Sequence, residues 1–167
     1  MTISVHTISK QDYPWVGEVF AREWGAEFLV VKGRLIHPER LQGFYAANET
    51  GDRIGLVTYE VVGNDCEMVS LNAFTRQAGI GTALVTHLRK MAIAHGCHRL
   101  WLVTTNDNLD ALRFYQRRGF HLAGLILNGI DEDRKLKPQI PSTGMFGIPL
   151  RDEIILEMNF TKSDEQR

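Results

Sequence analysis

The sequence lacks several features that would assign a protein to a specialised class. Its 167 residues include only two cysteines, Cys66 and Cys97, too few for a disulfide framework and suited to a reducing cytosol. The N-terminus lacks the basic region and apolar run of a signal peptide, and no stretch approaches the roughly 20 apolar residues of a membrane span. We therefore expect a cytoplasmic protein that has no membrane partner.

An excess of charge of one sign is also missing. The 19 Lys and Arg residues nearly balance the 20 Asp and Glu residues, which leaves a net charge of −1. A chain so close to neutral offers no electrostatic footprint for nucleic acid, so that class of partner is disfavoured. The length and the 44% hydrophobic content are typical of one globular domain, here residues 1–167.

The most informative stretch that is present is a turn at residues 76–82, between a predicted strand and a predicted helix. Apolar residues recur at helical spacing after it, so Gly79 and Gly81 lie at a helix N-terminus. The unpaired N–H groups and partial positive charge of a first helical turn bind anions, and glycine lets a phosphate approach the backbone. We therefore expect a phosphate-bearing ligand there. The alternative is a turn that only lets a strand meet a helix.

Two common phosphate motifs do not fit this turn. A nucleoside-triphosphate loop requires Gly-Lys-Ser/Thr, whereas Gly81 is followed by Thr82 and Ala83. The dinucleotide fingerprint requires Gly or Ala where this chain has Leu84. What remains is Arg76-x-x-Gly79-x-Gly81, a moderately specific pattern.

The predicted elements change in kind near residue 75. Before it, strands are expected at residues 2–8, 43–48, 54–62 and 67–74, with a helix over 11–24, while 28–31 fit either a strand or a helix. After it, helices are expected over 79–95 and 108–118, and strands over 98–104, 120–130 and 153–160. The pattern indicates an α/β (α+β) domain with an antiparallel N-terminal meander, in which strands 67–74 and 98–104 are parallel neighbours.

A second motif follows in Asn108-x-x-Ala111-x-x-x-Tyr115-x-x-x-Gly119-Phe120. Asn108 lies where a helix N-cap belongs, and Ala111 and Tyr115 are one turn apart on one helix face. Together with Arg76-x-x-Gly79-Ile80-Gly81, this motif resembles the GCN5-related N-acetyltransferase (GNAT) superfamily over about residues 41–130. The resemblance implies a mixed central sheet of six to seven strands flanked by helices, with a splayed parallel pair at the cofactor site.

The resemblance also implies roles for individual residues. Acetyl-coenzyme A is the expected co-substrate, with its pyrophosphate on the turn and its pantetheine arm along the strand that ends near residue 74. The implied cofactor-binding residues are Asn72, Ala73, Phe74, Arg76, Gln77, Ala78, Gly79, Ile80, Gly81, Thr82, Asn108, Ala111, Arg113 and Tyr115. Tyr115 matches the general acid, and an unperturbed tyrosine has a proton to give at neutral pH. Glu67 is the expected base, although a solvated place on the meander would also explain it.

The expected function is therefore transfer of an acetyl group to an amine by direct attack. A non-catalytic coenzyme-A sensor is the alternative, and a hydroxyl acceptor or a longer acyl group is a third interpretation. No metal is expected, because His95, Cys97 and His98 straddle a helix end and lack a fourth ligand. For the 3′-phosphate of the coenzyme, the basic candidates are Arg89, Lys90, Arg113, Arg117 and Arg118.

Three further hypotheses concern the periphery of the chain. Residues 131–150, charged and then rich in proline and glycine, form a loop that could act as a lid over the acceptor. Residues 162–167 are expected to be a frayed tail. Exposed edge strands make a homodimer a reasonable hypothesis.

Overall fold

The computed structural model describes residues 2–75, 79–161 and 163–164. The chain divides into two compact units. Unit 1 comprises Met1–Val16, Glu39–Leu100 and Asn159–Arg167, and unit 2 comprises Gly17–Pro38 and Trp101–Met158. Helix α1 (Tyr13–Trp24) and strand β7 (Arg99–Thr105) each begin in unit 1 and end in unit 2.

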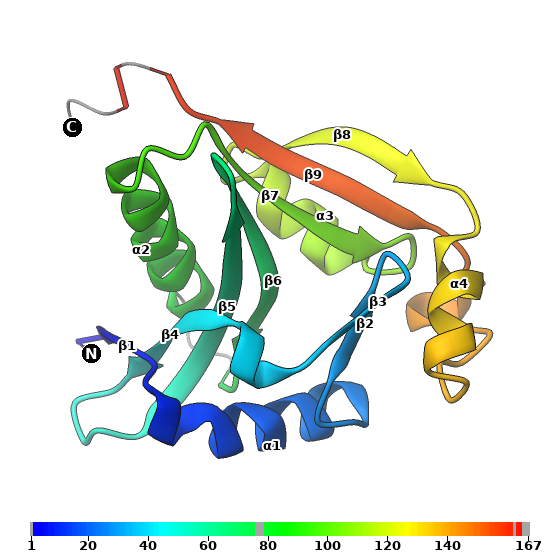
Figure 1. Cartoon of the computed structure of the whole chain (residues 1–167), viewed down its shortest axis with the longest axis horizontal. Helices are drawn as coiled ribbons and strands as arrows, with labels where there is room; N and C mark the ends of the chain where they lie inside the picture. Colours follow the sequence, from blue (N-terminus) through cyan, green and yellow to red (C-terminus); the bar gives the residue numbers. More distant parts are fainter. Residues whose placement is uncertain (1, 76–78, 162, 165–167) are drawn as a thin grey trace. The chain divides into compact units, whose positions relative to one another are not determined.

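Unit 1 is an antiparallel meander covered on one face by a helix (Figure 1). Its strands are β1 (Ser4–Thr7), β4 (Gln42–Ala47), β5 (Arg53–Val62) and β6 (Asp65–Ala73), and they pair in that order with β1 at the edge. Helix α2 (Ile80–Ala94) packs on β4, β5 and β6. Its apolar stripe, which includes Leu84 and Leu88, is fully buried against this sheet.

Gly55 in β5 is what lets α2 approach the sheet so closely. A Cβ atom at this position would lie 2.6 Å from Ile80 Cγ2 and 3.1 Å from Leu84 Cδ1. Glycine inside a strand often marks such a close approach. The first turn of α2 can therefore pack against the centre of the meander because Gly55 has no side chain.

Unit 2 contains the remaining strands and three further helical segments. Strand β9 (Glu153–Asn159) lies between β7 and β8 (His121–Ile126) and is antiparallel to β8. Strands β2 (Leu29–Val31) and β3 (Arg34–Ile36) form a separate hairpin. The helices are α3 (Leu109–Gln116), α4 (Gly129–Leu136) and a short 3-10 turn at Met145–Gly147.

Most predicted elements are present, and two boundaries were wrong. The strand predicted over 120–130 ends at Ile126, because Asn128 adopts a left-handed conformation and caps α4. The loop predicted over 131–150 is consequently shorter, since its charged beginning, residues 131–136, belongs to α4. Charges there pair at helical spacing, Arg134 with Asp131 and Lys135 with Glu132. Residues 28–31, left open by the sequence, contain β2.

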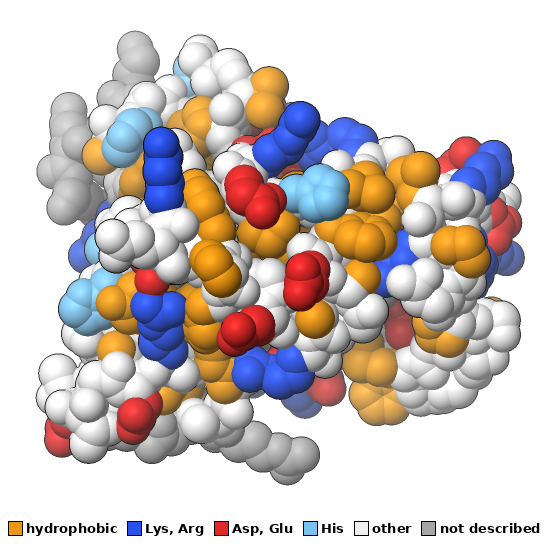
Figure 2. All heavy atoms as spheres, turned by 60° about the horizontal axis from the view of Figure 1, so that its bottom comes forward, with side chains coloured by type: hydrophobic (Ala, Val, Ile, Leu, Met, Phe, Trp, Pro, Cys, Tyr) orange, Lys and Arg blue, Asp and Glu red, His pale blue; other side chains and the backbone are white. Residues whose placement is uncertain are grey.

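The surface mixes both signs of charge. Figure 2 shows basic and acidic side chains interspersed with apolar ones over the face in view. Across residues 2–75, 79–161 and 163–164, no helix has the length and apolar character needed to cross a membrane. Within the same residues, no cluster of three or more His, Cys, Asp or Glu side chains could hold a metal ion.

Candidate active site

A β-bulge in β6 decides which side chains of this strand share a face. Thr58 of β5 pairs with Ser70, but Tyr59 pairs with Met68, so Val69 is the extra residue. On β5, residues 56, 58 and 60 share one face, and their partners across the ladder are Asn72, Ser70 and Glu67. Without the bulge, the odd-numbered Glu67 would face the other way.

This polar face is the one that α2 does not cover. A Cβ atom at Gly55 would point toward α2. Side chains alternate along a strand, so Leu56, Thr58 and Glu60 point to the opposite face. Glu67 is 4% exposed, and Thr58 and Ser70 are buried and bonded hydroxyl to hydroxyl at 2.6 Å. The Oδ1 atom of Asn72 is buried and has no hydrogen-bond partner among the described residues.

The beginning of α2 has the geometry expected of the glycine turn. Gly79 is the N-cap, with φ 103°, a conformation that side-chain-bearing residues rarely adopt. Arg76, Gln77 and Ala78 lie outside the described residues. Ile80 is fully buried, Gly81 and Thr82 are half-buried, and both belong to the first turn of the helix.

A shallow hollow of about 480 Å³ lies along α2 beside this turn. It is lined by Val5, Gly79, Thr82, Ala83, Thr86, His87 and Lys90. Of the basic residues proposed for the 3′-phosphate, Lys90 therefore shares a helix face with the turn. Arg89 instead pairs with Asp164, which also orders Thr161 in the C-terminal segment.

The end of β6 meets an aromatic cluster within unit 1. The N–H of Phe74 donates to the carbonyl of Ile54 at 2.9 Å, and its ring meets Trp15 edge to face, 6.2 Å between centroids. The Arg53 guanidinium lies 4.3 Å from the centre of the Trp15 ring and 4.6 Å from that of Tyr45. Ala73, paired with Gly55, is exposed. The cluster fixes where the strand that carries Asn72 ends.

In unit 2, α3 carries the second motif. Asn108 is its N-cap, as predicted, and its Oδ1 accepts a hydrogen bond from the Ala111 N–H at 3.1 Å. Arg113 is exposed and pairs with Asp110 at 3.0 Å, an ion pair three residues apart on the helix surface. Arg113 is therefore a surface residue of α3.

Tyr115 is the buried residue of α3. Its ring meets Phe114 and Phe120 edge to face, with centroids 5.1 and 5.4 Å apart. Burial raises the pKa of the Tyr115 hydroxyl well above its usual range, and the nearby Arg118 guanidinium opposes that shift. Arg118 is held over the Phe114 ring, 3.5 Å from its centre. A tyrosine in this environment keeps its proton through the neutral pH range.

Comparisons with known proteins cover the part of the chain that contains both motifs. A model of the Acetyltransferase (GNAT) family matches residues 4–120. The uncharacterised protein YdhI of Bacillus subtilis is 41% identical over 138 residues, 83% of this chain and 86% of YdhI. The chain belongs to the GNAT family of acetyltransferases.

Solved structures agree with the GNAT fold. An IAA acetyltransferase from Bacillus cereus has a TM-score of 0.75 at 20% identity and covers 95% of this chain and 100% of its own. A GNAT acetyltransferase from Elizabethkingia anophelis, solved with acetyl-CoA bound, has a TM-score of 0.67 at 18% identity and covers 95% and 98%. The predicted fold class is confirmed: an α+β GNAT-like fold with seven strands in its mixed sheet and one parallel pair, β6 and β7.

Sequence reasoning missed several residues that shape this GNAT chain. Gly55 could have been noticed as a lone glycine inside a strand pattern. Thr58 and Ser70 carried no signal, because their pairing depends on the strand register. Asp107, buried at 4% exposure, accepts hydrogen bonds from the Thr105 hydroxyl and the Met145 N–H, and it too was missed.

Proposed function

We propose that this GNAT protein transfers the acetyl group of acetyl-coenzyme A to an amine acceptor. The observation that carries the proposal is the family match over residues 4–120, which includes both motifs. The left-handed Gly79 at the N-terminus of α2 supports a phosphate site there, because the backbone N–H groups are unobstructed by a Cβ. A GNAT structure of the same fold holds acetyl-CoA.

The proposed reaction is a direct attack. The neutral amine attacks the thioester carbonyl, a tetrahedral intermediate forms, and the carbon–sulfur bond breaks to leave an amide. Tyr115 donates its proton to the departing thiolate, and Glu67 accepts the proton that the amine loses. The elevated pKa of Tyr115 keeps it protonated until the thiolate appears.

In this proposal the coenzyme binds through residues 72–74 of β6, the turn 76–82, and Asn108, Ala111, Arg113 and Tyr115 of α3. Asn108 uses Oδ1 to cap the helix, which supports a contact from its amide nitrogen to the pantetheine arm. The acceptor is an amine whose identity the motifs do not specify. A homodimer stays a hypothesis.

The test combines binding with turnover. Calorimetric titration with acetyl-CoA should show saturable binding that is lost in Gly81→Glu, because a carboxylate would then occupy the phosphate position. Ala94→Glu, which adds the same charge at an exposed position near the other end of α2, is the matched control and should bind normally.

Turnover is measured as thiol release with a panel of primary amines that includes a polyamine, an aminoglycoside, an amino acid and a peptide with a free N-terminus. Release above background supports the transferase and names an acceptor class. Binding with no release from any amine would favour the coenzyme-A sensor, and absence of binding would overturn both.

A further inference from the structure

The polar face of β5 and β6 carries a pair of hydroxyl groups and an amide in addition to Glu67, the proposed base. On this face, three successive rows of side chains carry Glu67 opposite Glu60, then the Thr58–Ser70 pair, then Asn72 opposite Leu56. Rows on one face are about 7 Å apart along a strand, so the hydroxyl pair stands midway between the carboxylate and the amide. Only the bulge at Val69 places all three on one face.

The middle row consists of two buried polar side chains. Thr58 is 0% exposed and Ser70 is 5% exposed, whereas Val57, Tyr59 and Met68 on the other face of the same strands are apolar. Their mutual hydrogen bond of 2.6 Å offsets the cost of burying the two hydroxyls, and two apolar residues of similar shape would be nearly as stable. Bulges occur often beside active sites, where they re-aim a side chain. Packing therefore does not require two hydroxyls in this row, and the pair is available for a chemical role.

Asn72 shows where a ligand is needed. Its Oδ1 is buried without a partner among the described residues, and a buried acceptor of this kind calls for a donor. An attacking amine has N–H groups to donate. The amine is therefore expected at the Asn72 row, one row from the hydroxyl pair and two rows from Glu67.

We propose that the Ser70–Thr58 hydroxyl pair relays the proton of the acceptor amine, held by Asn72 Oδ1, to Glu67. This inference rests on the proposed transferase function and extends it. The amine nitrogen gives its proton to Ser70 Oγ, Ser70 gives its own to Thr58 Oγ, and Thr58 gives its own to the Glu67 carboxylate. The row spacing requires a water molecule between the rows at each end. The amine loses one proton, Glu67 gains one, and both hydroxyls are regenerated.

The test uses three variants and the panel amine with the highest turnover. Ser70→Ala and the double variant Thr58→Val/Ser70→Ala break the relay, and Thr58→Ser keeps the hydroxyl and is the rescue control. Removing one hydroxyl leaves the other buried without its hydrogen-bond partner, whereas replacing both with apolar groups is nearly neutral for stability. We expect the double variant to unfold close to the wild-type temperature and still to turn over at least about tenfold more slowly at pH 7.

The pH profile separates a relay from a structural role. In the relay variants the amine must lose its proton to bulk water, so the acidic limb of kcat/KM should move toward the pKa of the free amine. Above that pKa the variants should approach the wild-type rate. Acetyl-CoA affinity should be unchanged in all three, since neither hydroxyl is assigned to the coenzyme.

Three results would overturn the relay. The double variant could keep the wild-type pH profile, Thr58→Ser could be as slow as the double variant, or the loss of rate could be equal at every pH. Each leaves the transferase intact, because the wild-type protein still binds acetyl-CoA and releases thiol. A wild-type protein that acetylates no amine would instead overturn the proposed function and the relay with it.

Discussion

At the scale of single residues, Tyr115 is the best-defined participant in the proposed reaction. Its ring packs edge to face on Phe114 and Phe120, and burial of the hydroxyl disfavours the charged phenolate. The pKa of Tyr115 is therefore raised, and Arg118 limits the increase. The hydroxyl therefore stays protonated through the neutral pH range.

Tyr115→Phe should lower kcat by about a hundredfold or more, because only the proton donor is removed. The ring packing on Phe114 and Phe120 is kept, so the dissociation constant for acetyl-CoA should stay near the wild-type value. Steady-state kinetics and calorimetry measure the two quantities. An unchanged kcat would mean that water or another group supplies the proton.

The same residue indicates a pH dependence. Since burial raises the pKa of Tyr115, the wild-type enzyme should show no loss of kcat from tyrosine ionisation up to about pH 10, the ordinary tyrosine value. A rate profile from pH 6 to 10.5 tests this. A decline centred below pH 10 that is absent in Tyr115→Phe would contradict the assignment of the raised pKa.

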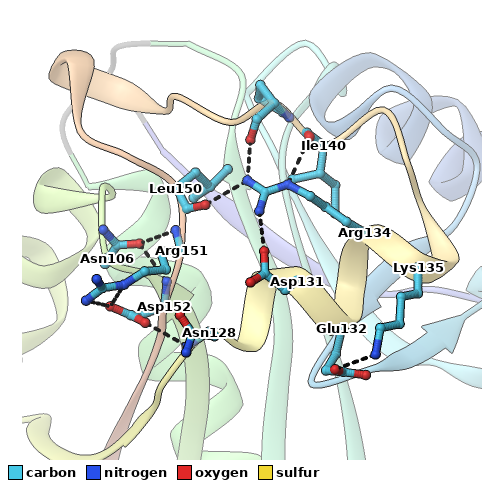
Figure 3. A network of polar contacts seen from close by, with 11 residues as sticks. Asn106, Asn128, Asp131, Glu132, Arg134, Lys135, Ile140, Leu150, Arg151 and Asp152 are labelled. Atoms are coloured by element: carbon cyan, nitrogen blue, oxygen red, sulfur yellow. Dashed lines mark hydrogen bonds and ion pairs between the residues drawn. The ribbon is translucent and has the colours of Figure 1, made fainter.

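At the scale of elements, the segment after α4 is anchored more extensively than its proline and glycine content suggests. Arg134 of α4 donates to the carbonyls of Ile140, Pro141 and Leu150 and pairs with Asp131 (Figure 3). Asn106, at the end of β7, bonds the carbonyl of Pro149 and the N–H groups of the two residues that follow Leu150. If this segment acts as a lid, the residues between these hydrogen-bonded positions are the part that would move.

Arg134→Met should release the segment while keeping the length of the side chain. We expect the KM for the amine to rise several-fold, with the acetyl-CoA dissociation constant unchanged, because the segment is proposed to border only the acceptor. Lys135→Met, which removes an exposed lysine from a surface ion pair on the same helix, is the control for loss of charge. Unchanged acceptor kinetics in Arg134→Met would count against the lid.

A second feature at this scale joins the β2–β3 hairpin to α4 and β9. Glu153 accepts a hydrogen bond from the Lys32 N–H at 3.0 Å, and Asp133 accepts one from the Gly33 N–H at 2.6 Å. Both carboxyl groups are 2% exposed. Burial, opposed by the Lys32 N–H and reinforced by Asp133, raises the pKa of Glu153 to about 7. Two neighbouring carboxyl groups in one dry site favour keeping a proton between them.

This pair should make stability fall as the pH rises. The folded protein binds this proton more tightly than the unfolded chain does. The free energy of unfolding should therefore fall as the pH rises from the ordinary glutamate pKa to about 7. Glu153→Gln, which is neutral at every pH, should flatten the dependence and raise the melting temperature at pH 8 by roughly 2–4 °C per kcal/mol recovered. Thermal unfolding at pH 5, 6.5 and 8 measures this. Parallel curves for the two proteins would contradict it.

At the scale of the whole molecule, the exposed edge of the sheet in unit 2 is apolar. Strand β8 is an edge strand, and in and beside it Leu122, Leu125 and Leu127 are 57%, 58% and 66% exposed. Charged residues commonly protect such edges from pairing with another chain, and residues 122–130 contain none.

Replacement of both Leu122 and Leu125 by lysine should reduce self-association without lowering activity per chain. The leucines are exposed, so the change should cost less than about 1 kcal/mol of stability. Sedimentation velocity over a range of concentrations tests this. If the wild-type and variant proteins sediment identically at every concentration, β8 does not mediate association.

The sequence by itself determined the family, the order of the elements and the start of α2 at Gly79, because helical and strand periodicity and two short motifs are local properties. It also determined the N-cap at Asn108, which depends on residues three positions apart. The polar face of β6 was decided only by the tertiary structure, since the bulge at Val69 changes which residues share a face and nothing in the local sequence marks it. The end of β8 was likewise decided by a left-handed Asn128, and the burial of Glu153 by a hairpin more than a hundred residues away. Such features arise from pairing and packing between distant segments, which no local pattern records.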